Sequence, residues 1–437
     1  MRRRIPATLL AITCTAGSAL AQPAPSFPNA HDSDPARLGW MLGSPPPADK
    51  IIRQEDGSMY RFPQLRWTFS NARQFGPTAT VSRGIGAPLP LPRAERDDLD
   101  AVRFTPLGGE QSMSWREAFD ANYTDGVVVL HRGRIVYERY AGVFGPERQH
   151  MAQSVTKSFY GTLAAMLVAE GKLDQDAPVT QYVPELKDSA FGDATVRQVM
   201  DMRTGLKYRE DYADPSSEIW AYVRAGHVMA RPPGYQGPTS FYEYLQTVQK
   251  EGEHGGAFAY KTINTDVLGW IIRRVSGQSI RELLSERIWK PLGMEQDAFF
   301  TVDAIGIEFA GGGLNTGLRD LARFGELMRR GGDWQGRQII PRAAVALIQR
   351  GGDRATFAPA GYVTLPGWSY RAMWWVSHNA HGAYMARGIH GQSIYVDPKA
   401  EMVIARYASH PVAPNPVNDP TTLPAYHALA QHLMAQP

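Results

Sequence analysis

The sequence has 437 residues, of which 43% are hydrophobic and 20% charged, so it is long enough to bury a large core. Its formal charge at pH 7 is +3, and three of the positive charges are arginines at positions 2 to 4. Without them the balance is neutral, which argues against a basic surface for nucleic acid or for a membrane.

The chain begins with a stretch typical of a secretory signal peptide. MRRR is followed by the apolar run IPATLLAITCTAGSALAQ, and we expect cleavage after Ala21, giving a signal peptide at residues 1–21. The run is too short to span a bilayer comfortably, and no other segment reaches membrane length. The single cysteine, Cys14, falls within this peptide. We therefore expect a periplasmic or secreted protein that is stabilised by core packing and has no disulfide.

The next part of the sequence, residues 22–114, is rich in proline, as in SPPPAD (44–49) and GAPLPLPRAE (86–95). This composition predicts an extended arm that wraps the body of the protein. The body begins near residue 115. In GVVVLHRGRIVYERYA (126–141), two β-rich runs are joined at His131, Arg132 and Gly133, which predicts a β-hairpin.

A serine and a lysine three residues apart stand where the following helix is predicted to begin, in SVTK (154–157). Positions i and i+3 share a helix face, so Lys157 can reach the Ser154 hydroxyl. The helix N-terminus favours developing negative charge, and an amine desolvated at the edge of a core loses proton affinity. The pair therefore suggests a serine nucleophile activated by a lysine. The structural alternative is an N-cap serine beside a solvated lysine.

Residues 175–299 carry several helical patterns, including 194–205 and 265–277, and predict an inserted all-α domain. A further amphipathic helix is predicted at 314–332. β-Rich segments return at 367–376, 388–398 and 401–409, and a last helix is predicted at 424–435. This order predicts an α/β (α+β) fold in which residues 115–174 and 300–437 together build one sheet flanked by helices.

Two further segments suit a cleft beside such a serine. Tyr260 comes just before the helix predicted at 265–277, where its phenol points into a cleft or packs at a domain boundary. In MARGIHGQSIYVDP (385–398), a glycine-flanked strand lets a backbone N–H approach a substrate closely.

No metal or cofactor is expected. His378, His381 and His390 lie close together in sequence without the spacing of metal ligands, and we interpret them as surface or hydrogen-bonded histidines. The G-x-S-x-G, H-E-x-x-H, Walker and dinucleotide-binding motifs are absent.

The three segments, in this order, resemble the serine β-lactamase and penicillin-binding-protein superfamily over about residues 115–435. The pattern of that superfamily is S-x-x-K, then Y-x-N, then K-T-G on a strand, and here these are SVTK, YKT (260–262) and ARG (386–388). EDYADP, NTDVLGW and GGLNTGLRDLARFG look most like the branch with 6-aminohexanoate-dimer hydrolase and related esterases. The resemblance implies a β-lactamase-like antiparallel sheet flanked by helices.

The resemblance also implies the roles of site residues. Ser154 is the implied nucleophile, Lys157 and Tyr260 share the proton transfers, and the backbone N–H groups of Ser154 and Ile389 hold the oxyanion. The remaining residues expected to bind substrate are Thr262, Gly388, His390, Tyr212 and Trp374. For Trp374 and the neighbouring Trp375, core packing is the alternative interpretation.

This chain departs from the superfamily pattern in ways that weaken recognition of β-lactams. Ala386 has no charge where the superfamily has lysine, Arg387 is expected to face the other side of the strand, and Thr262 replaces an asparagine. Glu210 and Asp211 are candidate bases for deacylation, but a solvated acidic loop is the favoured interpretation.

We expect an exported serine hydrolase that cleaves amide or ester bonds of small molecules through an acyl-enzyme. A β-lactamase or D-alanyl-D-alanine peptidase is one alternative, and a non-catalytic binding protein with this fold is another. The oligomeric state and the actual substrate stay open.

Overall fold

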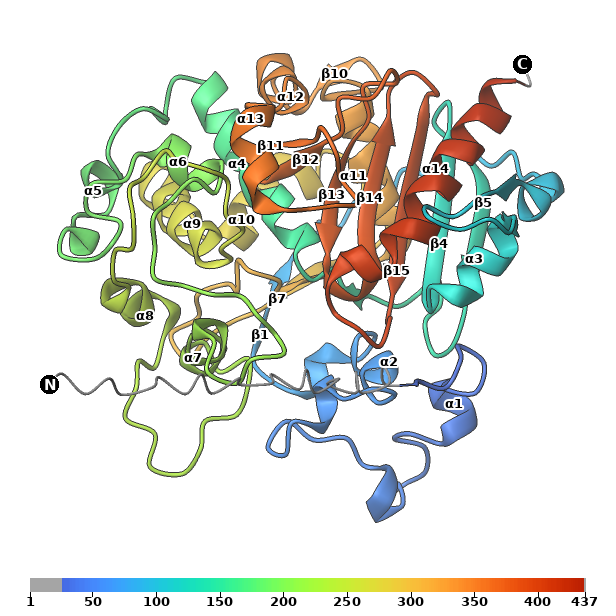
Figure 1. Ribbon diagram of the computed structural model, residues 1–437, viewed down its shortest axis with the longest axis horizontal. Helices are drawn as coiled ribbons and strands as arrows, with labels where there is room; N and C mark the ends of the chain where they lie inside the picture. Colours follow the sequence, from blue (N-terminus) through green and yellow to red (C-terminus); the bar gives the residue numbers. More distant parts are fainter. Residues whose placement is uncertain (1–25, 436–437) are drawn as a thin grey trace, which may run out of the picture.

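A seven-stranded antiparallel sheet forms the centre of the protein, whose computed structural model describes residues 26–435 (Figure 1). The strand order is β11-β12-β13-β14-β15-β4-β5. Two strands come from the first half of the chain and five from its last 70 residues, so the predicted assembly of one sheet from both ends is confirmed. The strands are β4 (Thr124–His131), β5 (Arg134–Tyr140), β11 (Ser369–Arg371), β12 (Trp374–Val376), β13 (Tyr384–Gly388), β14 (Gln392–Asp397) and β15 (Met402–Ala408).

The predicted hairpin is β4 and β5, joined by a two-residue turn. His131 pairs with Arg134, and the two residues between them, Arg132 and Gly133, have φ angles of 52° and 77°. Positive φ at both central residues is the geometry whose twist matches a hairpin of right-twisted strands.

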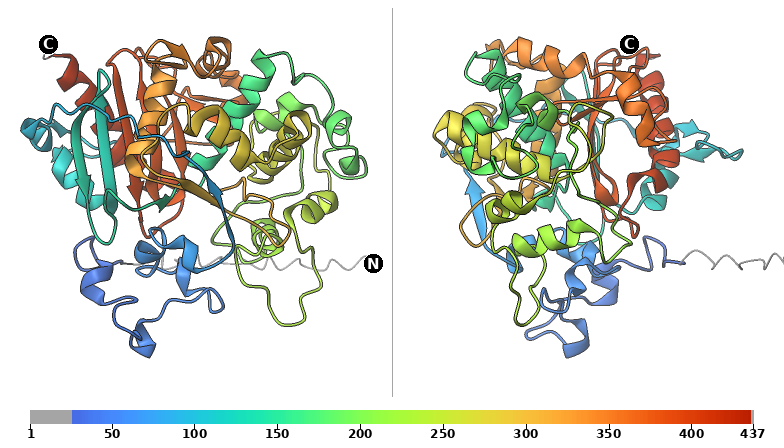
Figure 2. Two further views of the ribbon diagram at one scale, coloured as in Figure 1. Left: turned by 180° about the vertical axis from the view of Figure 1, so that it is seen from behind. Right: turned by 60° about the vertical axis from the view of Figure 1, so that its left-hand side comes forward.

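Helices cover both faces of the sheet. Behind it in Figure 1, α4 (Val155–Ala169) packs on β12, β13 and β14, and α11 (Leu318–Arg329) packs on β14, β15 and β4. The view from behind in Figure 2 shows α11 crossing the sheet. The rings of Phe159 on α4 and Phe324 on α11 stack at 4.0 Å between centroids, which makes these two helices one layer. None of the helices in the described residues combines the length and apolar content that a membrane span requires.

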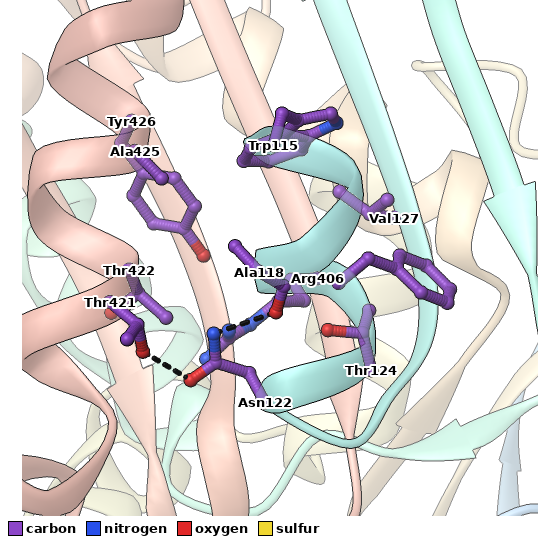
Figure 3. Close-up of a pocket in the computed structure, with 11 residues that line it drawn as sticks. Trp115, Ala118, Asn122, Thr124, Val127, Arg406, Thr421, Thr422, Ala425 and Tyr426 are labelled. Carbon is purple, nitrogen blue, oxygen red and sulfur yellow. Dashed lines mark hydrogen bonds between the residues drawn. The ribbon is translucent and has the colours of Figure 1, made fainter. Parts of the chain in front are cut away.

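The opposite face is covered by α3 (Trp115–Ala121) and α14 (Asp419–Met434) (Figure 3). The hydroxyl of Thr421 donates to the side-chain carbonyl of Asn122 at 2.7 Å, and the amide of Asn122 donates to the carbonyl of Ala118 at 2.8 Å. The cavity left between these helices and β15 measures about 10 Å³. It holds at most a single water, so this face is packed shut.

Between residues 175 and 297 the described elements are helical and lie beside the β11 edge of the sheet (Figure 1). The helix predicted at 194–205 ends early, at Met200. The backbone leaves the helical conformation at Met202, where φ is 52°, and the preceding Asp201 carboxylate accepts hydrogen bonds from Arg371 and from the backbone of Ala372. The helices of this region are α5 (Val179–Tyr182), α6 (Val196–Met200), α7 (Glu218–Ala225), α8 (Phe241–Thr247), α9 (Ile263–Ser276) and α10 (Ile280–Leu284).

A second sheet joins the Pro-rich arm to the body. Its order is β1-β7-β8-β6, with β1 (Thr78–Val81), β6 (His150–Met151), β7 (Ala298–Thr301) and β8 (Leu314–Thr316). β8 takes up the first residues of the helix predicted at 314–332, which begins only at Leu318. The arm also contains α1 (Pro35–Leu38) and α2 (Leu65–Thr68). Arg66 on α2 forms a buried ion pair with Asp125 at 3.3 Å, so the arm is anchored to the start of β4. The signal peptide predicted at residues 1–21 lies outside the described residues.

The smaller elements complete the chain. They are the hairpins β2 (Arg103–Phe104) with β3 (Met113–Ser114) and β9 (Asp333–Trp334) with β10 (Arg337–Gln338), and the helices α12 (Arg342–Gln349) and α13 (Arg354–Phe357).

Close backbone contact fixes α4 against the turn between β11 and β12. A Cβ at Gly161 would lie 1.9 Å from the carbonyl oxygen of Ala372, so only glycine permits this approach. One turn earlier, the Ser158 hydroxyl donates to the carbonyl of Met373 at 2.7 Å. These contacts determine where the start of α4 meets the sheet.

Candidate active site

Ser154 and Lys157 meet at the N-terminus of α4. Ser154 is the residue before the helix, and the Lys157 Nζ donates to its Oγ at 2.8 Å. The same amine donates to the carbonyl of Gly311 at 2.6 Å. Lys157 is only 1% exposed, so the solvated lysine of the structural alternative is excluded.

Burial changes the acid–base behaviour of the lysine. Desolvation lowers the pKa of Lys157 to about 8, although the negative charges of Glu210 and Asp266 act in the opposite direction. An amine with this pKa is neutral in an appreciable fraction near neutral pH and can accept a proton from a hydroxyl 2.8 Å away.

Tyr260 faces the same pair from just before α9. Its ring lies 5.1 Å from the Lys157 Nζ and stacks on Trp375, with 5.8 Å between ring centroids. Burial, together with the charge of Glu210, raises the pKa of Tyr260 well above its usual 10, and a hydrogen bond to Ser154 offsets this only in part. The phenol is therefore protonated at neutral pH.

The end of β13 approaches the start of α4 closely. A Cβ at Gly388 would come 2.9 Å from the carbonyl oxygen of Ala152 and 3.0 Å from the backbone nitrogen of Ser154. Glycine thus allows the strand to bring Ile389 beside the serine, as the glycine-flanked pattern predicts. The backbone N–H groups of Ser154 and Ile389 belong to the two segments that border the Oγ.

Two cavities meet at Ser154 and share that residue, Tyr212 and Ile389. The first, the polar cavity, has a volume of about 250 Å³. It is lined by Ser154, Glu210, Tyr212, Tyr260, Tyr362, Trp375, Arg387, Gly388, Ile389 and residues 414–416. The second, the apolar cavity, has a volume of about 320 Å³ and is lined mainly by apolar side chains of α7 and of the residues after it. The arm contributes Gly57, Tyr60 and Arg61.

Thr262 and Tyr212 are tied together by Glu210. The backbone N–H and the hydroxyl of Thr262 donate to the Glu210 carboxylate at 2.8 and 2.7 Å, and the Tyr212 hydroxyl donates to it at 2.7 Å. Glu210 is thus part of the cleft wall and not of a solvated loop, whereas its neighbour Asp211 is exposed. The expectation of a solvated acidic loop is wrong for Glu210.

Arg387 also lines the polar cavity, contrary to the expectation that it turns away. It does alternate with Ala386, which is fully buried in the core, and it forms a buried ion pair with Asp419 of α14. Its long side chain nevertheless reaches the cleft, where its guanidinium lies 5.2 Å from the centre of the Trp375 ring. The strand therefore does present a cation to the cleft. The cation comes from Arg387, one position after Ala386, where the superfamily has its lysine.

The two tryptophans of β12 are separated by strand alternation. Trp374 is fully buried, and its indole N–H donates to the carbonyl of Ser158 at 3.1 Å. It therefore packs in the core, and the prediction that it binds substrate in the cleft is wrong. Trp375 points the other way and lines the polar cavity. His390 lines the apolar cavity, where burial lowers its pKa to about 4 and its Nδ1–H donates to the carbonyl of His410 at 2.6 Å.

The other histidines have partners of their own. His378 pairs with the Ser369 hydroxyl at 2.7 Å and His381 with the Asp397 carboxylate at 2.7 Å. Among the residues that the structure describes, no cluster of three possible ligands is placed to hold a metal ion.

Gly311 is a site residue that sequence reasoning missed. Its carbonyl accepts the Lys157 hydrogen bond, and a Cβ there would meet Phe309 and Thr262, each at 2.5 Å. The run of three glycines at 311–313 was the available signal, because such a run allows close backbone approach.

Comparison with known proteins shows the family. A sequence model described as beta-lactamase matches residues 117–427, which is more than half of the chain. This chain belongs to the beta-lactamase family. It is 37% identical over 350 residues to 6-aminohexanoate-dimer hydrolase of Paenarthrobacter ureafaciens, covering 80% of this chain and 86% of that protein. The resemblance stated from the sequence motifs is thereby confirmed.

Solved structures show the same fold. A candidate 6-aminohexanoate-dimer hydrolase from Bacillus anthracis superposes with a TM-score of 0.81 at 31% identity, over 90% of this chain and 100% of the other. A penicillin-binding-protein homologue from Caulobacter crescentus gives a TM-score of 0.55 at 20% identity, over 72% and 96% of the chains, which supports the fold alone. The protein is therefore a hydrolase-type member of this family with a β-lactamase-like antiparallel sheet.

Proposed function

We propose that the protein is an exported serine hydrolase that cleaves ester or amide bonds of small molecules through an acyl-enzyme on Ser154. The observation that carries this proposal is the 2.8 Å hydrogen bond between Ser154 Oγ and the Nζ of Lys157, a buried amine whose pKa is lowered to about 8. Export rests on the signal-peptide pattern at the start of the sequence.

Acylation begins when neutral Lys157 takes the Ser154 proton and Oγ attacks the carbonyl carbon. The negative charge on the carbonyl oxygen is stabilised by the N–H groups of Ser154 and Ile389, and loss of one such donor typically costs roughly 3 kcal/mol. As the bond to the leaving group breaks, Tyr260 gives that group its proton. The proton held by Lys157 then restores the phenol, so the amine is neutral again.

Deacylation runs the same transfers with water. Neutral Lys157 takes a proton from the water that attacks the ester carbonyl, and passes that proton to Ser154 Oγ as the serine leaves, while the Tyr260 phenol stays protonated. Glu210 already accepts hydrogen bonds from Thr262 and Tyr212, which leaves it the role of holding the cleft wall in place.

Two alternatives carry over from the sequence. The uncharged Ala386 argued against a β-lactamase or D-alanyl-D-alanine peptidase. Arg387 places a cation in the polar cavity, and this observation weakens that argument. Its ion pair with Asp419 offsets that charge, so esters and simple amides stay the preferred substrates. A non-catalytic binding protein requires neither the buried lysine nor the phenol next to the serine.

The test is a panel of p-nitrophenyl esters, short-chain amides and nitrocefin assayed side by side with wild-type protein and Ser154→Ala. We expect turnover of esters, weaker turnover of amides and little of nitrocefin, all lost in the variant. Preferential turnover of nitrocefin would establish the β-lactamase alternative, and no turnover of any substrate would favour the binding protein.

A further inference from the structure

The two cavities that meet at Ser154 differ in chemistry. The polar cavity contains a carboxylate, a guanidinium and three phenols, contributed by Glu210, Arg387, Tyr212, Tyr260 and Tyr362. The apolar cavity is lined by side chains such as Val223, Val228 and Met229. A substrate whose carbonyl lies over Ser154 must place one half in each cavity.

The position of the proton donor decides which half goes where. Tyr260 lines the polar cavity and does not line the apolar one. A leaving amine or alcohol must be within hydrogen-bond reach of its proton donor as the bond breaks. The leaving group therefore occupies the polar cavity, and the acyl group, which stays on Ser154, occupies the apolar cavity.

The N-terminal arm supplies part of the wall of the apolar cavity. Gly57, Tyr60 and Arg61 line it together with residues from α7 and the segment after it. No aspartate or glutamate is among the described residues that line this cavity, and its charged or titratable members are Arg61, His390, Tyr60 and Tyr212. A cationic acyl group would thus lose its hydration without gaining a counterion, which is costly in an apolar site.

We propose that the arm completes an acyl pocket for uncharged, apolar acyl groups, and that this pocket discriminates against acyl groups ending in ammonium. This specificity rests on the proposed acyl-enzyme function and adds the substrate class. It separates the protein from its relative named for the 6-aminohexanoate dimer, because a 6-aminohexanoyl group ends in ammonium at neutral pH.

The test compares two p-nitrophenyl esters of equal length, the heptanoate and the 6-aminohexanoate, with the acetate as a short reference. The leaving group is the same in all three, so differences in kcat/KM report on the acyl pocket. We expect kcat/KM to rise from acetate to heptanoate, by up to about fourfold for each methylene that is buried. We expect the heptanoate to exceed the 6-aminohexanoate by about tenfold or more.

A matched pair of variants tests the charge argument. Met229→Glu places a carboxylate in the wall of the apolar cavity, whereas Met229→Gln has nearly the same size without charge. The glutamate variant should lower the ratio of heptanoate to 6-aminohexanoate by tenfold or more relative to the glutamine variant. Equal ratios in the two variants would overturn the proposal.

A second pair tests the arm. Tyr60→Ala removes the ring that the arm contributes, and Tyr60→Phe keeps it. The alanine variant should lose more activity on the heptanoate than on the acetate, while the phenylalanine variant keeps the wild-type ratio of the two. Equal losses on both esters in Tyr60→Ala would show that the arm does not form the pocket.

Failure of this inference differs from failure of the proposed function. If wild-type protein hydrolyses acetate, heptanoate and 6-aminohexanoate esters equally and Ser154→Ala hydrolyses none, the acyl-enzyme stands and the apolar acyl pocket is refuted.

Discussion

Replacing Lys157 by methionine should stabilise the fold while it abolishes hydrolysis. The lysine is fully buried, and its pKa falls from 10.5 to about 8 on folding because its charged form is desolvated. This lowering corresponds to about 3 kcal/mol of unfolding free energy lost at pH 7. Methionine has a similar length and no charge. It gives up the hydrogen bonds to Ser154 and Gly311, worth roughly 1 kcal/mol each, so the net gain should be about 1–2 kcal/mol.

The gain should depend on pH with a definite sign. Between pH 8 and 10.5 the unfolded chain binds more protons at Lys157 than the folded chain does, so wild-type stability rises with pH across this window. The advantage of Lys157→Met should therefore shrink by about 2 kcal/mol between pH 7 and pH 10.

Urea unfolding followed by tryptophan fluorescence measures both quantities. Ser154→Ala is the matched control, because it is also inactive but keeps the lysine, and its stability should follow the pH dependence of the wild type. A difference between Lys157→Met and wild type that stays constant from pH 7 to pH 10 would refute the desolvated lysine, and with it the argument for a lysine base.

Three further outcomes follow from the same geometry. In wild-type protein, kcat/KM for p-nitrophenyl esters should rise with pH to a plateau with an apparent pKa near 8, because acylation needs neutral Lys157; a flat profile between pH 6 and 9 would contradict this. Tyr260→Phe should lose roughly 10²–10⁴ on amides and less on p-nitrophenyl esters, whose phenolate leaves without a proton; equal losses in parallel assays would assign Tyr260 to positioning or serine activation. Gly161→Ala should destabilise the folded protein by about 1–3 kcal/mol in thermal unfolding, although this change ordinarily stabilises a helix interior, because the new Cβ would lie 1.9 Å from the carbonyl oxygen of Ala372. An unchanged or raised Tm would show that this contact relaxes freely.

Local patterns in the sequence were enough to predict much of the fold. The hairpin at His131–Arg134 follows from a glycine turn between β-branched runs, and the helix after Ser154 follows from its apolar run. The meeting of Ser154 with Lys157 follows from helical spacing alone. Each of these features depends on residues within one or two turns of each other in the chain.

The joining of both chain ends in one sheet was predicted, but several finer features that depend on distant segments were missed. The arm strand Thr78–Val81 is four residues long and has meaning only beside its partner β7, more than 200 residues later. The Lys157 partner at Gly311 is a backbone carbonyl, which no residue type announces. Of two adjacent tryptophans, one must face each side of the strand, and only the packing of α4 decides that Trp375 faces the cleft.

The position of the Arg387 guanidinium in the cleft could not be predicted for a different reason. Alternation correctly separates Ala386 from Arg387, but it describes where a side chain starts and not how far it reaches. Asp419 on α14 holds the guanidinium at the edge of the polar cavity, and that helix is more than 30 residues away in sequence.

Covalent labelling with a fluorophosphonate followed by peptide mass spectrometry tests the central claim most directly. We expect one adduct per chain, on the peptide that contains Ser154, with no adduct in Ser154→Ala and labelling slowed by roughly 10²–10⁴ in Lys157→Met. An adduct on another serine, or no adduct on folded wild-type protein, would contradict the assignment of Ser154 as an activated nucleophile.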